Sequence, residues 1–272
     1  MVRRIELSEI QNIEFEILKE VVRVCEENGL EYYLVAGTLL GAVRHSGFIP
    51  WDDDIDIALP RDDYNKIEEI FRNNAPVYYK WVDYKDNSRI AYHFGKICDA
   101  RTTLVETALR KEYRVPLGIN IDVFPLDGTP NSIVARKVHF AYIRFLWTLI
   151  ILNRLDNSTP RPLHKKLIIS LVQHFLDDDL LKVLHESLER ELRRYPFDCA
   201  EYVCNFSGAG GMSEMFPKAW ISDYSFVEFE GIKARAFQKY DQYLSQIYGD
   251  YMTMPPIEER KAPHLFEAYY IE

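Results

Sequence analysis

The chain has 272 residues, of which 47% are hydrophobic and 14% aromatic, so it can bury a sizeable core and is not expected to be disordered. Its formal charge of -9, from 33 basic and 42 acidic side chains, argues against nucleic-acid binding, which requires a basic surface. An anionic substrate would need a metal ion or a few well-placed cations.

Cysteine spacing and apolar runs predict a cytoplasmic location. Cys25, Cys98, Cys199 and Cys204 form no C-x-x-C pair and no disulfide framework. The N-terminal stretch becomes charged and helical at once, so no export signal is expected. The longest apolar run, FLWTLIIL at 145–152, is far shorter than the ~20 residues that a membrane-spanning helix needs.

The first predicted elements are a helix and two strands. Ser8 and Gln11 form a capping-box pattern, and apolar residues then recur at helical spacing until Asn28 and Gly29. YYLVA at 32–36 predicts a buried strand, LLGAV a short helix, and residues 54–59 a second strand.

The later pattern changes from mixed to helical. Residues 61–71 predict a helix, and 77–84, 90–98 and 118–126 predict strands. Residues 131–194 are mostly helical, with a polar break, DNSTPRP, at 156–162. We therefore predict an α+β protein with a mixed-sheet core at 1–128. A mostly helical region at 129–272 completes it, either separately or within one continuous domain.

The sequence GFIPWDDDIDIAL, at 47–59, places four aspartates at the start of a predicted strand. Alternate strand residues share a face, so Asp54 and Asp56 point the same way, while Asp52 and Asp53 are expected to shape the entry loop. Two such carboxylates repel each other unless a cation lies between them, and Mg²⁺ prefers oxygen ligands. Asp122, alone among the apolar residues of NIDVF, is the expected third ligand.

Other interpretations of the aspartates fit less well. A solvated loop does not explain why Asp56 lies inside an apolar run. An EF-hand starting at Asp52 would need glycine where Ile57 stands. A haloacid-dehalogenase nucleophile would lie at the end of its strand. A glycosyltransferase with a D-x-D pair would have several βα units before it.

Residues near the aspartates are candidates for phosphate binding. Gly37 and Thr38 lie between a strand and a helix, where backbone N–H groups can approach a phosphate. Arg44 and His45 follow them, and Lys96 follows the strand pattern AYHFG. For each of these residues an ordinary turn, loop or strand-end position remains the alternative.

The order of these motifs is that of the nucleotidyltransferase fold. VAGTLLGAVRHSGFIPWDDDIDIAL resembles the defining motif of the LicD-type choline-phosphate transferase family, which includes the fukutin-related proteins. GKICDARTT, IDVFPLDG and YLSQIYGDYMTMPP extend the resemblance, whereas RAFQKYDQYL departs from a stretch that often contains proline in the family.

The resemblance implies transfer of phosphocholine from CDP-choline to a sugar hydroxyl of a teichoic acid or lipopolysaccharide, with release of cytidine monophosphate. Asp54, Asp56 and Asp122 would hold Mg²⁺, or Mn²⁺, and Asp122 could also accept the proton of the hydroxyl. Another CDP-alcohol such as CDP-ribitol, a true nucleotidyltransferase, and a binding module without activity remain alternatives.

Two further partners follow from these expectations. A choline head group needs aromatic faces, for which the candidates are Tyr78, Tyr79, Trp81, Tyr84 and Tyr92. A lipid-linked glycan would bring the enzyme to the inner face of the membrane. FLWTLIIL is flanked by basic side chains and is either a membrane-surface helix or a buried core helix; the basic residues are Arg136, Lys137, Arg144, Arg154, Lys165 and Lys166.

Overall fold

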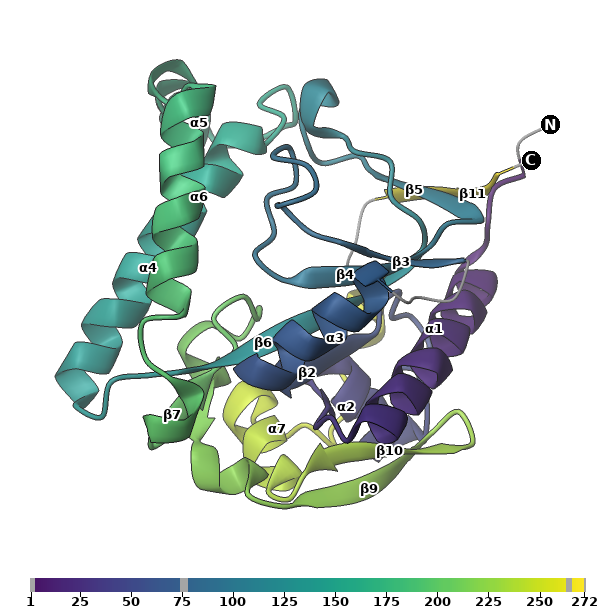
Figure 1. Cartoon of the computed structure of the whole chain (residues 1–272). Helices are drawn as coiled ribbons and strands as arrows, with labels where there is room; N and C mark the ends of the chain where they lie inside the picture. Colours follow the sequence, from purple (N-terminus) through teal and green to yellow (C-terminus); the bar gives the residue numbers. More distant parts are fainter. Residues whose placement is uncertain (1–2, 74–77, 263–265, 272) are drawn as a thin grey trace.

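The computed structural model describes residues 3–73, 78–262 and 266–271. A mixed sheet lies at the centre, with α1 and α3 beside it and a group of three helices, α4 to α6, at one edge (Figure 1). The strand order is β1-β2-β6-β4-β3, and β7 and β8 extend the sheet from β6. These strands are β1 (Tyr33–Leu34), β2 (Asp56–Pro60), β3 (Tyr79–Val82), β4 (Gly95–Asp99), β6 (Asn120–Gly128), β7 (Tyr202–Cys204) and β8 (Met215–Pro217).

Strand directions agree with the predicted α+β class. β2 and β6 run parallel, whereas β1 pairs with β2, and β4 with β6, in antiparallel fashion. Two smaller sheets complete the fold: β9 (Tyr224–Phe229) with β10 (Ile232–Phe237), and β5 (Thr102–Glu106) with β11 (Phe266–Tyr270). The core of the main sheet is closely packed, and Ile57, Ile121 and Val123 are fully buried in it.

Helix α1 (Leu7–Asn28) begins one residue earlier than its predicted cap. Glu6 and Glu9 form the capping box, so the predicted Ser8–Gln11 pair was wrong. The Gln11 side chain instead donates to the backbone oxygen of Asp52 at 2.8 Å. The helix ends as predicted, at Gly29 with φ 63°, a conformation that glycine adopts without strain.

The strands around the aspartates are shorter than predicted, and the helix between them is longer. Helix α2 (Ala36–His45) already includes Ala36 and Gly37, so no turn separates strand from helix at Gly37. Asp54 precedes β2, and β4 covers only the end of the strand predicted at 90–98. The strand predicted at 77–84 is β3; residue 77 lies outside the described part. Helix α3 (Arg61–Asn73) was predicted correctly.

The second half of the chain is helical first and then returns to the sheet. Helices α4 (Ile133–Arg154), α5 (Leu163–Phe175) and α6 (Asp178–Leu192) agree with the prediction and with its break at 156–162. The prediction of a mostly helical region at 129–272 was wrong after residue 192, where five strands, β7 to β11, and only one further α-helix, α7 (Tyr240–Tyr248), follow in the described residues. β7 and β8 span three residues each, too few for a periodic pattern to show. β7 pairs with β6, so residues on both sides of Gly128 share one sheet; a division at 128 stays a prediction.

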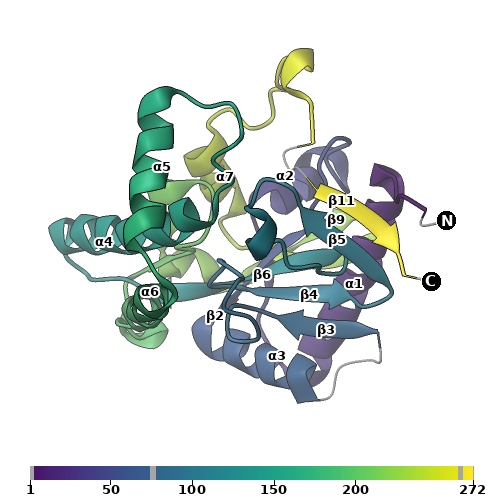
Figure 2. The same cartoon turned by 90° about the horizontal axis from the view of Figure 1, so that it is seen from above.

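Helix α4 carries the apolar run FLWTLIIL and has two apolar faces. Phe140, Ile143, Leu146 and Ile150 are buried against α6 and the loop after β7, whereas Phe145 is 58% exposed. Figure 2 shows α4, α5 and α6 at the edge opposite the chain termini. Within the described ranges, no helix combines the length and apolar character required to cross a membrane.

Candidate active site

Strand register brings three predicted site residues side by side. Asp56 on β2 pairs with Asp122 on the parallel strand β6, and Lys96 on β4 pairs with Asp122 from the other side. The Lys96 Nζ donates to Asp122 Oδ1 at 2.5 Å and to Asn120 Oδ1 at 3.1 Å. One end of the central sheet therefore presents two carboxylates and an ammonium group in adjacent positions.

The loop before β2 adds more carboxylates to this end of the sheet. One carboxylate oxygen from each of Asp52, Asp53 and Asp54 lies within 4.8 Å of the others. The sequence predicted a metal-binding role for Asp54 and a loop role for Asp52 and Asp53, but the structure gathers all three. Asp53 is buried, and it lines the same pocket as Asp54 and Asp56.

Glu14 on α1 also lines this pocket, and sequence reasoning missed it. Its side chain is only 2% exposed, and Oε2 has no hydrogen-bond partner among the described residues. Glu14 occupies the buried face of a regular amphipathic helix, between Ile10 and Ile17. The sequence did contain a signal for this residue, because an acidic side chain at a core position of a helix is costly without a partner or a bound cation.

Burial and neighbouring carboxylates raise the pKa of Asp56 and of Glu14. Burial, followed by Asp54 and Asp122, raises the pKa of Asp56 well above its usual value. Burial and the charges of Asp54 and Asp53 raise the pKa of Glu14 in the same way. A divalent cation would relieve both effects, and an all-oxygen donor set with an unpartnered buried carboxylate fits Mg²⁺ or Mn²⁺.

The carboxylates form one end of a cavity of about 480 Å³, a volume typical of small-molecule sites. Apart from Glu106, the lining from α4, β5 and β11, and from the residues just after α4 and β5, is apolar. Its side chains include Leu104, Leu109, Trp147, Ile151, Leu155 and Phe266. A ligand with a charged centre and a less polar end therefore matches the cavity.

Only Tyr92 among the five predicted aromatic candidates is among the described residues that line this cavity. Its hydroxyl donates to Glu106 Oε2 at 2.5 Å, and Lys96 lies 5.1 Å from the centre of its ring. The others lie elsewhere: Tyr78 is 53% exposed, Tyr79 is on β3, Trp81 packs against Gly95 and Tyr84 stacks on His93. Phe94, Phe124, Trp147 and Phe266 supply the other rings.

Helix α2 supports the acidic loop at its first turn. The backbone N–H of Asp56 donates to Thr38 Oγ1 at 2.8 Å, which fixes the start of β2. At Gly37 a Cβ atom would lie 2.7 Å from Asp52 Oδ2, so glycine allows this carboxylate to approach the helix. Both residues act through the aspartates, and neither is among the described residues that line the cavity.

Arg44 and His45 are not brought to the cavity. They occupy the last turn of α2, and the Arg44 Nη1 donates to the backbone oxygen of Tyr251 at 2.9 Å. His45 lies edge-on to Trp51, with ring centres 6.5 Å apart. Since α2 is ten residues long, a helical rise of ~1.5 Å per residue separates these side chains from its first turn.

A glycine-rich loop after β7 completes the wall and was not recognised in the sequence. Asn205, Ser207, Gly208 and Ala209 line the cavity. Glu214 holds this loop, since it accepts from Gly210 N at 3.3 Å and from Tyr243 Oη at 2.9 Å. Burial raises the pKa of Glu214 to about 7.

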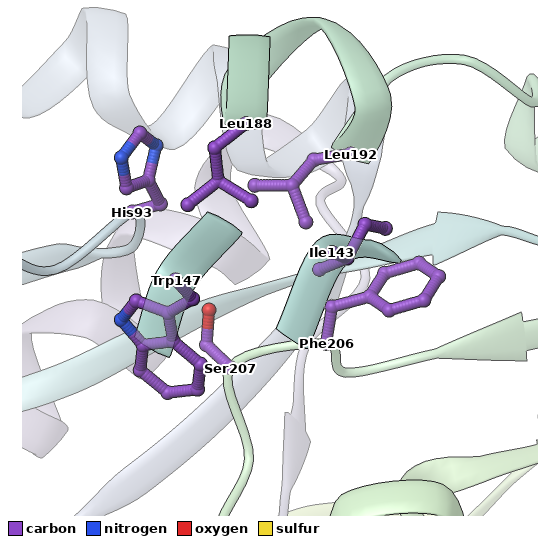
Figure 3. Close-up of a pocket in the computed structure, with 7 residues that line it drawn as sticks. All are labelled: His93, Ile143, Trp147, Leu188, Leu192, Phe206 and Ser207. Carbon is purple, nitrogen blue, oxygen red and sulfur yellow. The ribbon is translucent and has the colours of Figure 1, made fainter. Parts of the chain in front are cut away.

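A second cavity lies behind the first and is too small for a substrate. It measures about 10 Å³, roughly the space of one water molecule, and mostly apolar side chains surround it (Figure 3). Trp147 and Ser207 line both cavities and so separate them. The larger cavity is therefore the candidate active site.

Comparisons with known proteins converge on one family. Residues 29–140 match the model described as the LicD/FKTN/FKRP nucleotidyltransferase domain. The chain is 30% identical to the lipopolysaccharide cholinephosphotransferase LicD of Haemophilus influenzae, over 99% of this chain and 100% of that protein. It is 42% identical to the human ribitol 5-phosphate transferase FKRP over 55 residues, which are 20% of this chain and 11% of that protein.

Proposed function

Because this chain belongs to the LicD family of phosphotransferases, we propose that it transfers phosphocholine from CDP-choline to a hydroxyl group of a cell-surface glycan. The observation that carries the proposal is the pairing of Asp56 with Asp122 across parallel strands at the acidic end of the cavity. This arrangement places like charges where Mg²⁺ or Mn²⁺ would neutralise them and would also bind the pyrophosphate of a CDP-alcohol.

In the proposed reaction an acceptor oxygen bonds to the phosphorus of phosphocholine, and the bond from that phosphorus to the CMP oxygen breaks. The hydroxyl proton leaves to a carboxylate of the cluster, for which we name Asp122. A bound Mg²⁺ would supply charge neutralisation at the attacking and leaving oxygens. Asp54, Asp56 and Asp122, joined by Glu14, are the residues that would hold it.

Lys96 contributes a fixed positive charge to this site. It is buried, and its ammonium group contacts Asp122 while facing the rings of Tyr92 and Phe94. Burial alone would lower its pKa, but Asp122 and Glu106 raise it above the usual value. Lys96 therefore stays charged at neutral pH and can bind a donor phosphate as well as orient Asp122.

The apolar end of the cavity would take the choline head group. A quaternary ammonium has no hydrogen-bond donor and binds aromatic faces instead. Tyr92 and Phe94 already contact the Lys96 ammonium group, so Trp147 and Phe266 are the further rings at this end.

Ribitol phosphate is a second candidate, favoured by the similarity to FKRP over 55 residues. A panel of CDP-alcohols with Mg²⁺ and a glycan acceptor, followed by measurement of CMP, tests both candidates. We expect CDP-choline to give the fastest release, and Trp147→Ala to slow CDP-choline more than CDP-ribitol. Release of pyrophosphate from CTP, with no CMP from any CDP-alcohol, would favour a true nucleotidyltransferase.

A further inference from the structure

Helix α5 presents an unusual exposed surface. Of its thirteen residues only Ile169 is fully buried, whereas Leu163, Leu167, Leu171 and Phe175 are 73%, 63%, 60% and 66% exposed. They recur every four residues, so they form one stripe along the helix. Ile168, 51% exposed, widens the stripe.

Helix α4 repeats this arrangement. Val134, Val138, Tyr142 and Phe145 are each between 45% and 68% exposed and share one face, opposite the buried face described above. Soluble proteins rarely expose so many large apolar side chains on neighbouring helices without a partner.

The charge of this part of the chain is opposite to that of the whole. Residues 131–175 carry seven basic side chains and one acidic one, whereas the whole chain has 33 basic and 42 acidic. At 100° per residue, Lys165 and Lys166 lie on either side of the α5 stripe. Lys165 is exposed, and Arg161 precedes the helix.

The surface is held in place by the fold. Gln173 on α5 donates to the backbone oxygen of Leu155 at 2.9 Å, and Asn153 on α4 donates to that of Leu176 at 3.0 Å. In both views the helices stand away from α1 and the chain termini (Figures 1 and 2). The other side of α4 contributes Trp147 and Ile151 to the large cavity, and Leu155, the residue after the helix, also lines it.

We infer that α5, with the exposed face of α4, binds the surface of a membrane containing anionic lipids. An apolar stripe bordered by lysines suits the boundary between acyl chains and anionic headgroups. Since α4 also forms a wall of the cavity, binding would place the cavity next to the membrane, where a lipid-linked acceptor is found. Membrane binding itself does not depend on the proposed reaction.

Co-sedimentation of the full-length protein with vesicles tests this inference. We expect binding to vesicles of equal parts phosphatidylglycerol and phosphatidylcholine, and much weaker binding to phosphatidylcholine alone. Leu167→Glu with Leu171→Glu should weaken binding at least about tenfold. Lys165→Glu with Lys166→Glu should also weaken it about tenfold and reduce its dependence on salt.

Ile257→Glu is the matched control, because Ile257 is 77% exposed but lies outside these helices. It should bind as the wild type does. Circular dichroism and thermal unfolding would establish that each variant folds. If the double leucine variant does not fold, the double lysine variant still tests the inference.

Failure of the wild type to bind anionic vesicles would overturn the inference. So would equal binding by wild type and leucine variant. A dimer in sedimentation equilibrium that dissociates in the leucine variant, without vesicle binding, would instead identify the surface as a contact between two copies. Turnover of CDP-choline on a soluble acceptor would remain in each of these cases, so the proposed function is tested separately.

Discussion

The two ends of the strand pair β2–β6 carry opposite kinds of charge arrangement. At one end, Asp56 and Asp122 are paired like charges. At the other, Arg61 binds Asp127 with two hydrogen bonds, of 2.6 and 2.5 Å, and both side chains are buried. Asp127 keeps the pKa of Arg61 above its usual value.

This difference in charge arrangement indicates that one end of the strand pair contributes to stability and the other to function. The Arg61–Asp127 pair is neutral within the protein, so this end is complete without a ligand. At the other end Lys96 balances only part of the charge of several carboxylates. We therefore propose that a bound cation completes that end, at some cost in the stability of the empty protein.

The largest effect is expected at the acidic end. Asp56→Asn should lower kcat by roughly 10³, because it removes a carboxylate that would hold Mg²⁺ at the reacting phosphate. The free energy of unfolding should stay equal or rise, since a half-buried charge that its neighbours repel is lost. Initial rates of CMP release and urea unfolding would measure the two. Asp62→Asn, at an exposed position of α3, is the control, and surviving Mg²⁺-dependent turnover in Asp56→Asn would refute the assignment.

The opposite end should show the reverse result. Arg61→Met should lower the free energy of unfolding by about 3 to 5 kcal/mol, because it leaves Asp127 buried without its partner. Affinity for Mn²⁺, followed by electron paramagnetic resonance, should change little. Adding Asp127→Leu should recover most of the lost stability. If Arg61→Met abolished Mn²⁺ binding in a folded protein, the two ends would not be independent.

Glu214 extends the comparison to the glycine-rich loop, where stability and function meet. Burial raises its pKa in the folded state to about 7, from the usual value of 4.5, so the stability contributed by its protonated form is lost as the pH rises from about 4.5 to 7. Glu214→Gln should remove this slope, which amounts to about 3 kcal/mol. Urea unfolding at several pH values would measure it; parallel profiles for variant and wild type would contradict the expectation.

The smallest effect on stability is expected from removing one threonine hydroxyl group at each end of the β2–β6 strand pair. Thr38→Val removes the acceptor for the Asp56 N–H, and Thr129→Val removes a 2.9 Å bond to the backbone oxygen of Tyr202. Each should lower the free energy of unfolding by about 1 kcal/mol. Only Thr38→Val should also weaken Mn²⁺ binding, because Thr38 positions β2 at the acidic end. Equal effects on Mn²⁺ binding would remove this distinction.

The sequence was sufficient for the strands at the acidic end and for the family. A carboxylate in an apolar run has few structural explanations, so Asp56 and Asp122 could be singled out, and their direct pairing follows from parallel strands in register. The helices between 133 and 192 were predictable because each has several turns of apolar spacing.

Sequence reasoning missed the cavity residues whose neighbours along the chain give no indication of a contact with a distant segment. Glu14 interrupts an otherwise ordinary amphipathic helix, and the loop at 205–209 reaches the cavity only because β7 pairs with β6. Arg44 and His45 were assigned to phosphate because they follow Gly37, but α2 holds them in its last turn, and neither is among the described residues that line the cavity. Proximity along the chain was a poor guide to proximity in space.

The pairing of β6 with β7 determines how much of this chain would have to be grafted into another protein to transfer its activity. The segment that matches the family model ends at residue 140, inside α4, and already contains all the aspartates named above. Yet it lacks Glu14, Trp147 and the loop at 205–209, which form much of the cavity wall. A graft of residues 29–140 would carry these aspartates without Glu14 and without the rest of the cavity wall, so the smallest transplantable unit of this enzyme is close to the entire chain.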